Sequence, residues 1–145
     1  MEKALKEGKT KYIGVSNYPT ELFNEIKEYA EIMPAVNELE FHPRFAAPSV
    51  LEATKNIGIA LIWYGTGCSF TIEKNKVVAE IAAKYGYYPL SIVCKWTNLK
   101  GVCLIPRSDK PNHISDNLLS TDFDLALEEI AQFDSLNEDY LTTRI

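Results

Sequence analysis

A fourfold repeat constrains this chain more than any other feature of its sequence. A short apolar run rich in β-branched or aromatic residues is followed each time by a stretch with helical periodicity. The third run is almost entirely apolar, which is typical of a parallel strand covered on both faces. Four β/α units in succession predict a parallel sheet with right-handed crossovers. The predicted strands span residues 12–15, 35–41, 59–64 and 102–105.

Helical spacing of apolar residues follows each predicted strand. Thr20 is the predicted N-cap of the first helix, and Gly58 is the predicted stop of the second. The predicted helices span about 20–30, 49–57, 77–85, 90–99, 113–120 and 126–136.

Two architectures fit this pattern: a small doubly wound sheet, or part of a (β/α)8 barrel. A complete barrel needs about 250 residues, and the chain has 145. We expect a single domain over residues 1–145, because no linker or low-complexity tract divides the chain. The acidic stretch at 122–139 is interpreted as a solvated helix face rather than an interaction tail.

Composition narrows the classes of partner. The chain is 46% hydrophobic with a formal charge of −5, and it lacks a basic patch that could neutralise several phosphates, which argues against nucleic acid. No apolar run reaches the roughly 18 residues that span a bilayer, and the N-terminus lacks the apolar core of a signal peptide. The three cysteines are odd in number and lack CxxC spacing, so neither disulfides nor a metal site is predicted. We expect a cytoplasmic protein without a membrane partner.

Polar or glycine residues follow every predicted strand. In α/β folds the C-terminal ends of parallel strands meet on one face, so these residues are expected to line one ligand site. Amides and hydroxyls suit a polar headgroup, an aromatic ring suits stacking, and glycines and a cation suit phosphates. The residues at the strand ends are Ser16 and Asn17, Glu40 to Pro43, Tyr64 to Gly67, and Arg107 and Ser108.

Each of these residues also has a purely structural interpretation. Ser16 and Asn17 fit an ordinary turn, Tyr64 fits the core, and Arg107 fits the surface. His42 is expected to be structural, His113 an exposed residue in the first turn of a helix, and the cysteines small buried apolar residues. The motifs GxSxG, HExxH and Walker A are absent, as is GxGxxG.

Three segments carry a family resemblance. GKTKYIGVSNY at 8–18, PAVNELEFHP at 34–43 and IPRS at 105–108 resemble, in order and spacing, successive signatures of the aldo-keto reductases. The resemblance extends over essentially the whole chain. It implies the C-terminal half of a (β/α)8 TIM-type barrel, strands five to eight, in an oxidoreductase that uses NADPH, or less often NADH, to reduce aldehydes and ketones to alcohols.

The resemblance also implies a role for individual residues. Ser16 and Asn17 resemble the pair that binds the nicotinamide carboxamide, and Tyr64 resembles the tyrosine that stacks on the nicotinamide. The further implied contacts are Gly65, Thr66 and Gly67 at the pyrophosphate, Arg107 and Ser108 at the adenosine 2′-phosphate, and Asp116 and Asn117 near the adenine.

Two positions depart from the family pattern. Glu38 stands where the family usually has a glutamine at the carboxamide, and a carboxylate offers no N–H donor. His113 stands where many NADPH-dependent members have an arginine at the 2′-phosphate. The substitution at 113 weakens the implied preference for NADPH over NADH.

The family's catalytic Asp, Tyr, Lys and His belong to the N-terminal half of the barrel, so the resemblance implies no catalytic residue in this chain. Met1 aligns inside the helix before the fifth strand. One hypothesis is a portion of a longer reductase that is inactive alone and meets its small carbonyl substrate only with the N-terminal half. The alternative is an inactive half-barrel that binds nucleotide or assembles. A homodimer would then cover the open inner face of the sheet, predicted to carry Val15, Val36, Leu61 and Leu104.

Overall fold

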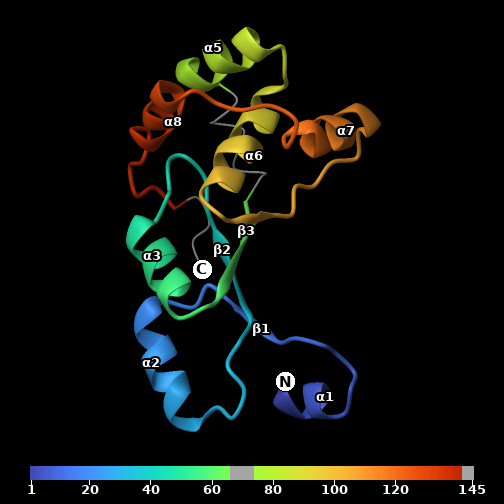
Figure 1. Ribbon diagram of the computed structural model, residues 1–145, viewed down its shortest axis with the longest axis vertical. Coiled ribbons are helices and arrows are strands. Elements are labelled where there is room, and N and C mark those ends of the chain that lie inside the picture. The colour runs from blue at the N-terminus through green and yellow to red at the C-terminus, as the bar shows by residue number, and fades with distance from the viewer. Residues whose placement is uncertain (66–73, 142–145) are drawn as a thin grey trace. The chain divides into compact units, whose positions relative to one another are not determined.

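The computed structural model describes residues 1–65 and 74–141 and contains a four-stranded sheet whose strands are hydrogen-bonded in chain order. The first two strands pair in parallel, with Gly14 opposite Val36 and Ser16 opposite Glu38. The predicted parallel α/β architecture is therefore confirmed (Figure 1). The strands are β1 (Gly14–Ser16), β2 (Val36–Glu40), β3 (Ala60–Tyr64) and β4 (Cys103–Leu104).

Helices separate the strands as the sequence periodicity predicts. They are α1 (Glu2–Lys6), α2 (Thr20–Tyr29), α3 (Pro48–Asn56), α5 (Lys76–Tyr85), α6 (Pro89–Leu99), α7 (Pro111–Leu119) and α8 (Leu127–Asp134). The chain forms two compact units, one of residues 1–39 and 47–62, the other of residues 40–46 and 63–145.

In the first unit, α2 packs against α3. The two strands approach closely at Gly14, where a Cβ atom would lie 2.4 Å from Cγ2 of Val36. Glycine at this position lets β1 and β2 pair without displacing the Val36 side chain. Phe23 of α2 is buried in this unit and packs its ring on Tyr18, with ring centroids 5.3 Å apart.

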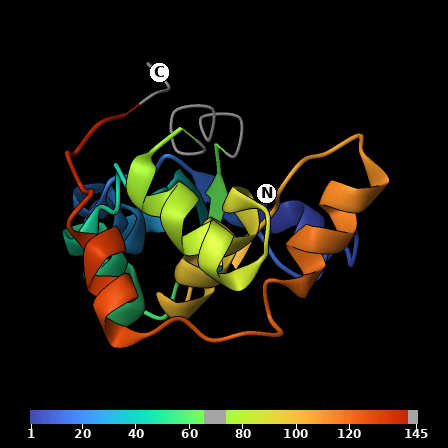
Figure 2. The same ribbon diagram turned by 90° about the horizontal axis from the view of Figure 1, so that it is seen from above.

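In the second unit, α6 is the central helix, and the residues from Leu90 to Thr97 are all buried. Trp96 stacks on Phe41 and Phe133, with centroid distances of 5.2 and 6.0 Å. Its indole N–H donates to Asp134 at 2.8 Å. Figure 2 shows α8 and α7 on opposite sides of the pair formed by α5 and α6.

Several local predictions were wrong in detail. The N-cap of α2 is Pro19, and Thr20 is already helical without a side-chain cap. Helix α7 begins at Pro111, before the predicted 113, because proline's fixed φ suits the first helical position. Cys94 is buried as predicted, whereas Cys103 is exposed.

Candidate functional site

The ends of β1 and β2 bring together three of the predicted cofactor residues. The Ser16 hydroxyl donates to the main-chain carbonyl of Glu38 at 3.0 Å, and the Asn17 main-chain N–H donates to the same oxygen at 2.9 Å. Asn17 has a φ of 53°, in the left-handed region that asparagine tolerates better than most residues. The strand therefore ends in a sharp turn at which both Ser16 and Asn17 remain exposed.

A buried asparagine, Asn37, stabilises this turn through hydrogen bonds to the backbone. Asn37 is fully buried, its amide N–H donates to the Tyr18 carbonyl at 2.9 Å, and its amide oxygen accepts from the Tyr18 N–H at 3.3 Å. A buried amide paired on both sides fixes the backbone that follows Asn17. Sequence reasoning passed over Asn37, because a polar residue within an alternating strand looks solvent-facing, and its neighbours Val36 and Glu38 give no signal of its burial.

Glu38 is half-buried and lies opposite Ser16 in the strand register. An ionised carboxylate accepts hydrogen bonds and donates none. At this corner, Glu38 can therefore accept from an amide N–H₂ of a ligand, and the exposed Asn17 lies at the end of the neighbouring strand. The three residues together can bind a carboxamide.

Tyr64 is the last residue of β3, and Gly65 follows it; both belong to the second unit. Tyr64 is half-buried, and Gly65 has a φ of 97°, which a side chain would disfavour. The positive φ of Gly65 turns the chain sharply where β3 ends. Thr66 and Gly67, the other predicted pyrophosphate residues, lie outside the described residues.

The segment leading into α7 contains the residues predicted at the 2′-phosphate. Arg107 is exposed, and the half-buried Ser108 accepts a hydrogen bond from the Lys110 N–H at 3.1 Å. His113 lies in the first turn of α7, as predicted, but is half-buried rather than exposed. Its imidazole stacks on the Tyr88 ring, with centroids 4.5 Å apart and planes inclined by 26°. Sequence reasoning could not find this contact, because its partners lie on separate helices.

Asp116 and Asn117 follow in the same helix, both half-buried. The amide oxygen of Asn117 is buried and has no hydrogen-bond partner within residues 1–65 and 74–141. An acceptor in this state suits a ligand that brings an amino group. Asn117 also lines a cavity of about 590 Å³ together with residues of α6, β4 and α7, including Cys103 and Leu118.

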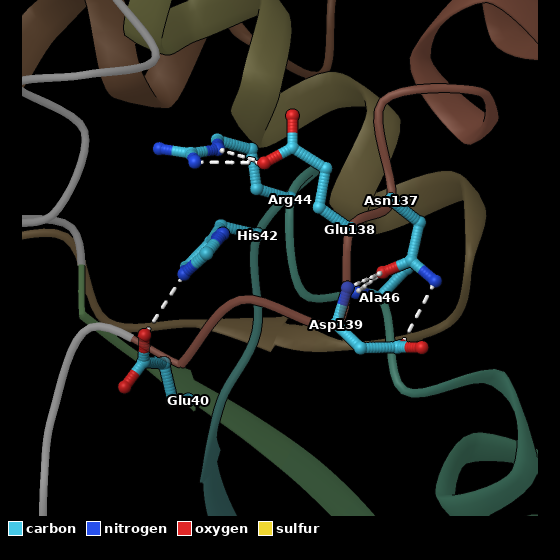
Figure 3. Close-up of polar contacts among 7 residues, drawn as sticks. All are labelled: Glu40, His42, Arg44, Ala46, Asn137, Glu138 and Asp139. Atoms are coloured by element: carbon cyan, nitrogen blue, oxygen red, sulfur yellow. Dashed lines mark hydrogen bonds and ion pairs between the residues drawn. The ribbon is translucent and has the colours of Figure 1, made fainter.

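A buried polar pair in the second unit joins Glu40, the last residue of β2, to His42 in the loop that follows (Figure 3). The Nε2 atom of His42 lies 2.9 Å from a carboxylate oxygen of Glu40, and both side chains are almost fully buried. Burial lowers the pKa of His42 below its ordinary value, and the hydrogen bond to Glu40 opposes this. The expectation of a structural rather than catalytic His42 fits this burial.

Residues of the same loop also contact the C-terminal segment. The Arg44 guanidinium donates to Glu138 through Nε and Nη2, at 3.2 and 2.7 Å, and lies 4.2 Å from the centroid of the Tyr140 ring. The Arg44 carbonyl accepts from the N–H groups of Glu138 and Tyr140. Asn137 accepts from the Ala46 N–H through its side-chain oxygen (Figure 3). We call residues 137–140 the C-terminal strap. No sequence pattern signalled it.

The residues predicted at the site therefore form local groups suited to binding: Ser16, Asn17 and Glu38 in the first unit, and the groups around Tyr64 and the start of α7 in the second. In the described part of the chain, no cluster of three or more His, Cys, Asp or Glu side chains could hold a metal ion. Among the same residues, no helix has both the length and the apolar character needed to cross a membrane.

Comparison with known proteins agrees with this geometry. The model of the aldo/keto reductase family matches residues 1–67. The chain is 37% identical to the 9,11-endoperoxide prostaglandin H2 reductase of Trypanosoma cruzi, over 96% of this chain and 50% of that protein. It is 30% identical to the NADPH-dependent D-xylose reductase of Meyerozyma guilliermondii, over 94% of this chain and 48% of the relative.

A solved structure extends the match. An aldo-keto reductase from a Medee basin deep-sea metagenome library superposes with a TM-score of 0.92 at 29% identity, covering 99% of this chain and 54% of that one. The chain thus spans about half the length of the relatives it matches, and its fold corresponds to about half of their barrel. The chain belongs to the aldo-keto reductase family.

Proposed function

We propose that the chain is the cofactor-binding, C-terminal half of an NADPH-dependent aldo-keto reductase that reduces aldehydes or ketones to alcohols. The observation that carries this proposal is the corner at the ends of β1 and β2, where Ser16 and Asn17 are presented around the Glu38 carbonyl. The fully buried Asn37 side chain fixes the backbone of Tyr18, which follows this turn. The turn therefore has a defined conformation before a ligand binds.

Each local group has the chemistry that one part of a nicotinamide dinucleotide requires. Asn17, Ser16 and Glu38 would bind the carboxamide, and Tyr64 would stack on the nicotinamide ring. Gly65 would approach the pyrophosphate, and the family resemblance assigns the same role to Thr66 and Gly67, which lie outside the described residues. Arg107, Ser108 and His113 would bind the 2′-phosphate. The orphaned amide oxygen of Asn117 is an acceptor for the adenine amino group, and Asp116 lies beside it in sequence. The cofactor, when bound, supplies a hydride to a carbonyl carbon.

The reaction itself requires more than these residues. Protonating the carbonyl oxygen needs a general acid, and we assign none in this chain. The proposal therefore includes an N-terminal half, in the same polypeptide or another, that supplies the acid and completes the substrate site. Cytoplasmic location belongs to the same proposal, and fractionation of the source cells tests it.

Nucleotide binding tests the cofactor role directly. We expect titration calorimetry of the 145-residue chain with NADPH to give saturable binding that Asn17→Gly weakens about tenfold, since the variant keeps the positive φ but loses the amide. Ser49→Ala, at an exposed position of α3, is the matched control and should bind as the wild type does. Equal binding by Asn17→Gly and the wild type would refute the assigned corner.

Cofactor choice is tested at position 113. His113→Arg places a bidentate cation where many family members have one, so we expect NADPH to bind about 3- to 30-fold tighter and NADH to bind as before. An equal change for both nucleotides would remove His113 from the 2′-phosphate site.

The intact mass of the native polypeptide in its source cells tests whether this is half of a longer enzyme. A mass near 16.4 kDa would favour the second candidate function, a half-barrel without reductase activity that assembles. That candidate rests on exposed apolar side chains, Ile114 and Leu118 among them, which line the cavity beside β4. A homodimer could cover them, and sedimentation analysis would detect it.

A further inference from the structure

The stack between Tyr88 and His113 singles out Tyr88 as a residue to which neither the sequence pattern nor the proposed function gives a role. Tyr88 is the N-cap of α6, yet its side chain makes no capping hydrogen bond. Serine, threonine, aspartate and asparagine are strongly preferred at N-caps, and a residue without a capping side chain costs a helix about 1 kcal/mol. A tyrosine there is a poor choice for the helix, so its ring contact is the more informative feature.

That ring contact restricts the orientation of the His113 imidazole. The imidazole lies on the phenol ring at 4.5 Å between centroids, nearly parallel at 26°. Both rings are half-buried. A stacked imidazole keeps its two nitrogens at its edges, and among residues 1–65 and 74–141 neither nitrogen has a hydrogen-bond partner. The stack therefore orients the His113 imidazole and leaves its ring nitrogens able to form hydrogen bonds.

The segment that leads into α7 carries cationic residues. Arg107 and Lys110 precede His113 on the same short segment, together with one carboxylate, Asp109. Lys110 is the N-cap of α7 and makes no side-chain cap there. An oriented imidazole on the same segment as these cations is suited to a phosphate monoester, which accepts several hydrogen bonds.

We infer that Tyr88 is a positioning residue for nucleotide selectivity: its ring holds the His113 imidazole so that the site distinguishes a 2′-phosphate from a 2′-hydroxyl. This inference rests on the proposed cofactor role and adds to it a residue outside the family motifs. Tyr88 acts through His113 and touches no reacting atom.

Substitution of Tyr88 can separate this role from a role in folding. Tyr88→Ser removes the ring and introduces a favoured N-cap, so the free energy of unfolding should stay the same or rise while selectivity falls. Tyr88→Phe keeps the ring and should keep selectivity. Tyr88→Thr, a second N-cap residue without a ring, repeats the test if the serine variant folds poorly.

The probes are 2′,5′-ADP and 5′-AMP, which differ only in the 2′-phosphate, titrated into the purified 145-residue chain by calorimetry. We expect the wild type to prefer 2′,5′-ADP, and Tyr88→Ser to reduce the ratio of the two affinities about two- to tenfold, the range that aromatic pair energies imply. Tyr140→Ser removes a ring that contacts Arg44 instead, and it should leave the ratio unchanged. In His113→Ala, the further change Tyr88→Ser should have no additional effect.

The two proposals fail differently. If the wild type binds neither nucleotide, the proposed cofactor role fails, and this inference fails with it. If the wild type prefers 2′,5′-ADP and both Tyr88→Ser and Tyr88→Thr keep the full ratio, only the role of Tyr88 is overturned. Loss of selectivity in Tyr88→Phe would also overturn it, because the hydroxyl rather than the stacked ring would then be responsible.

Discussion

Gly14 lies where β1 and β2 approach most closely. A Cβ atom there would be 2.4 Å from Val36 Cγ2 and 3.0 Å from the Val36 carbonyl oxygen. The second of these atoms is backbone and paired in the sheet, so the clash cannot be relieved by a side-chain rotation alone. The Ser16 corner follows two residues later on the same strand, which ties the site to this contact.

We therefore expect Gly14→Ala to lower the free energy of unfolding by about 1–3 kcal/mol, the usual cost of overpacking. Urea unfolding followed by tryptophan fluorescence measures it. Ser49→Ala, at an exposed position of α3, should change stability by less than about 0.5 kcal/mol. If Gly14→Ala unfolds at the wild-type midpoint, the close approach does not exist in solution.

His42 gives a pH dependence with a definite sign. Burial lowers its pKa in the folded chain, and the charge of Arg44 adds to this, while Glu40 opposes it. Below the ordinary value of 6.5, the unfolded chain therefore binds more protons than the folded chain, and stability decreases as the pH falls through that value.

The matching variant is His42→Gln, which retains a donor for Glu40 but does not titrate. Between about pH 7.5 and 5.5, the urea midpoint of the wild type should fall more than that of His42→Gln. Equal slopes would show that His42 contributes nothing to the acid sensitivity.

At the scale of single residues, the sequence predicted which side chains gather at strand ends but not what holds them. Ser16 and Asn17 follow an apolar run, so their place at the end of β1 could be predicted. Asn37 could not be found in this way, because its burial depends on Tyr18 folding back over it. The stack of Tyr88 on His113 depends equally on how two helices pack.

At the scale of elements, the sequence predicted which helices and strands are present more accurately than it predicted the residues at which they begin and end. Periodicity predicted the strands and the helices from α2 onward, whereas β1 and α7 were displaced by about two residues and the short α1 was implied only by the family resemblance. The C-terminal strap could not be predicted, because residues 137–140 have no periodicity and are held by contacts with Arg44 and Ala46, which are distant in sequence.

The contacts of the C-terminal strap with Arg44 lead to a prediction about hydrogen exchange. Arg44→Gln removes the forked contact to Glu138 and the ring contact to Tyr140. Because the pair is partly exposed, we expect global stability to change by less than about 1 kcal/mol. The amides of Glu138 and Tyr140, which donate to the Arg44 carbonyl, should nevertheless exchange with deuterium several-fold faster.

Lys76→Gln is the control, since it removes an exposed pair with Glu80 within α5. It should leave exchange in the strap unchanged. Wild-type exchange rates in Arg44→Gln would show that the backbone hydrogen bonds, rather than the arginine side chain, order the segment.

At the scale of the whole molecule, the chain has a sheet with two edge strands, β1 and β4, in a family whose solved barrels are about twice as long. Unpaired edges and exposed apolar side chains are liabilities that proteins normally cover. The prediction of one domain over 1–145 stays a prediction, as does the homodimer. Both depend on what completes the sheet, which sequence periodicity within this chain cannot specify.

The face beside β4 provides the test. Leu118 of α7 is 76% exposed and lines the cavity of about 590 Å³, together with Leu104 and Ile114. If this face normally packs against further protein, the isolated chain should bind the apolar dye ANS and run as a polydisperse sample. Leu118→Glu should lower both dye binding and association, because it places a charge on that face.

Leu127→Glu is the matched control, because Leu127 is 81% exposed at the start of α8. It should leave the dye signal at the wild-type level. A stable dimer with cooperative unfolding that Leu118→Glu dissociates would favour the assembling half-barrel. A monodisperse monomer that does not bind ANS would contradict both hypotheses, because the exposed leucines would then need no partner.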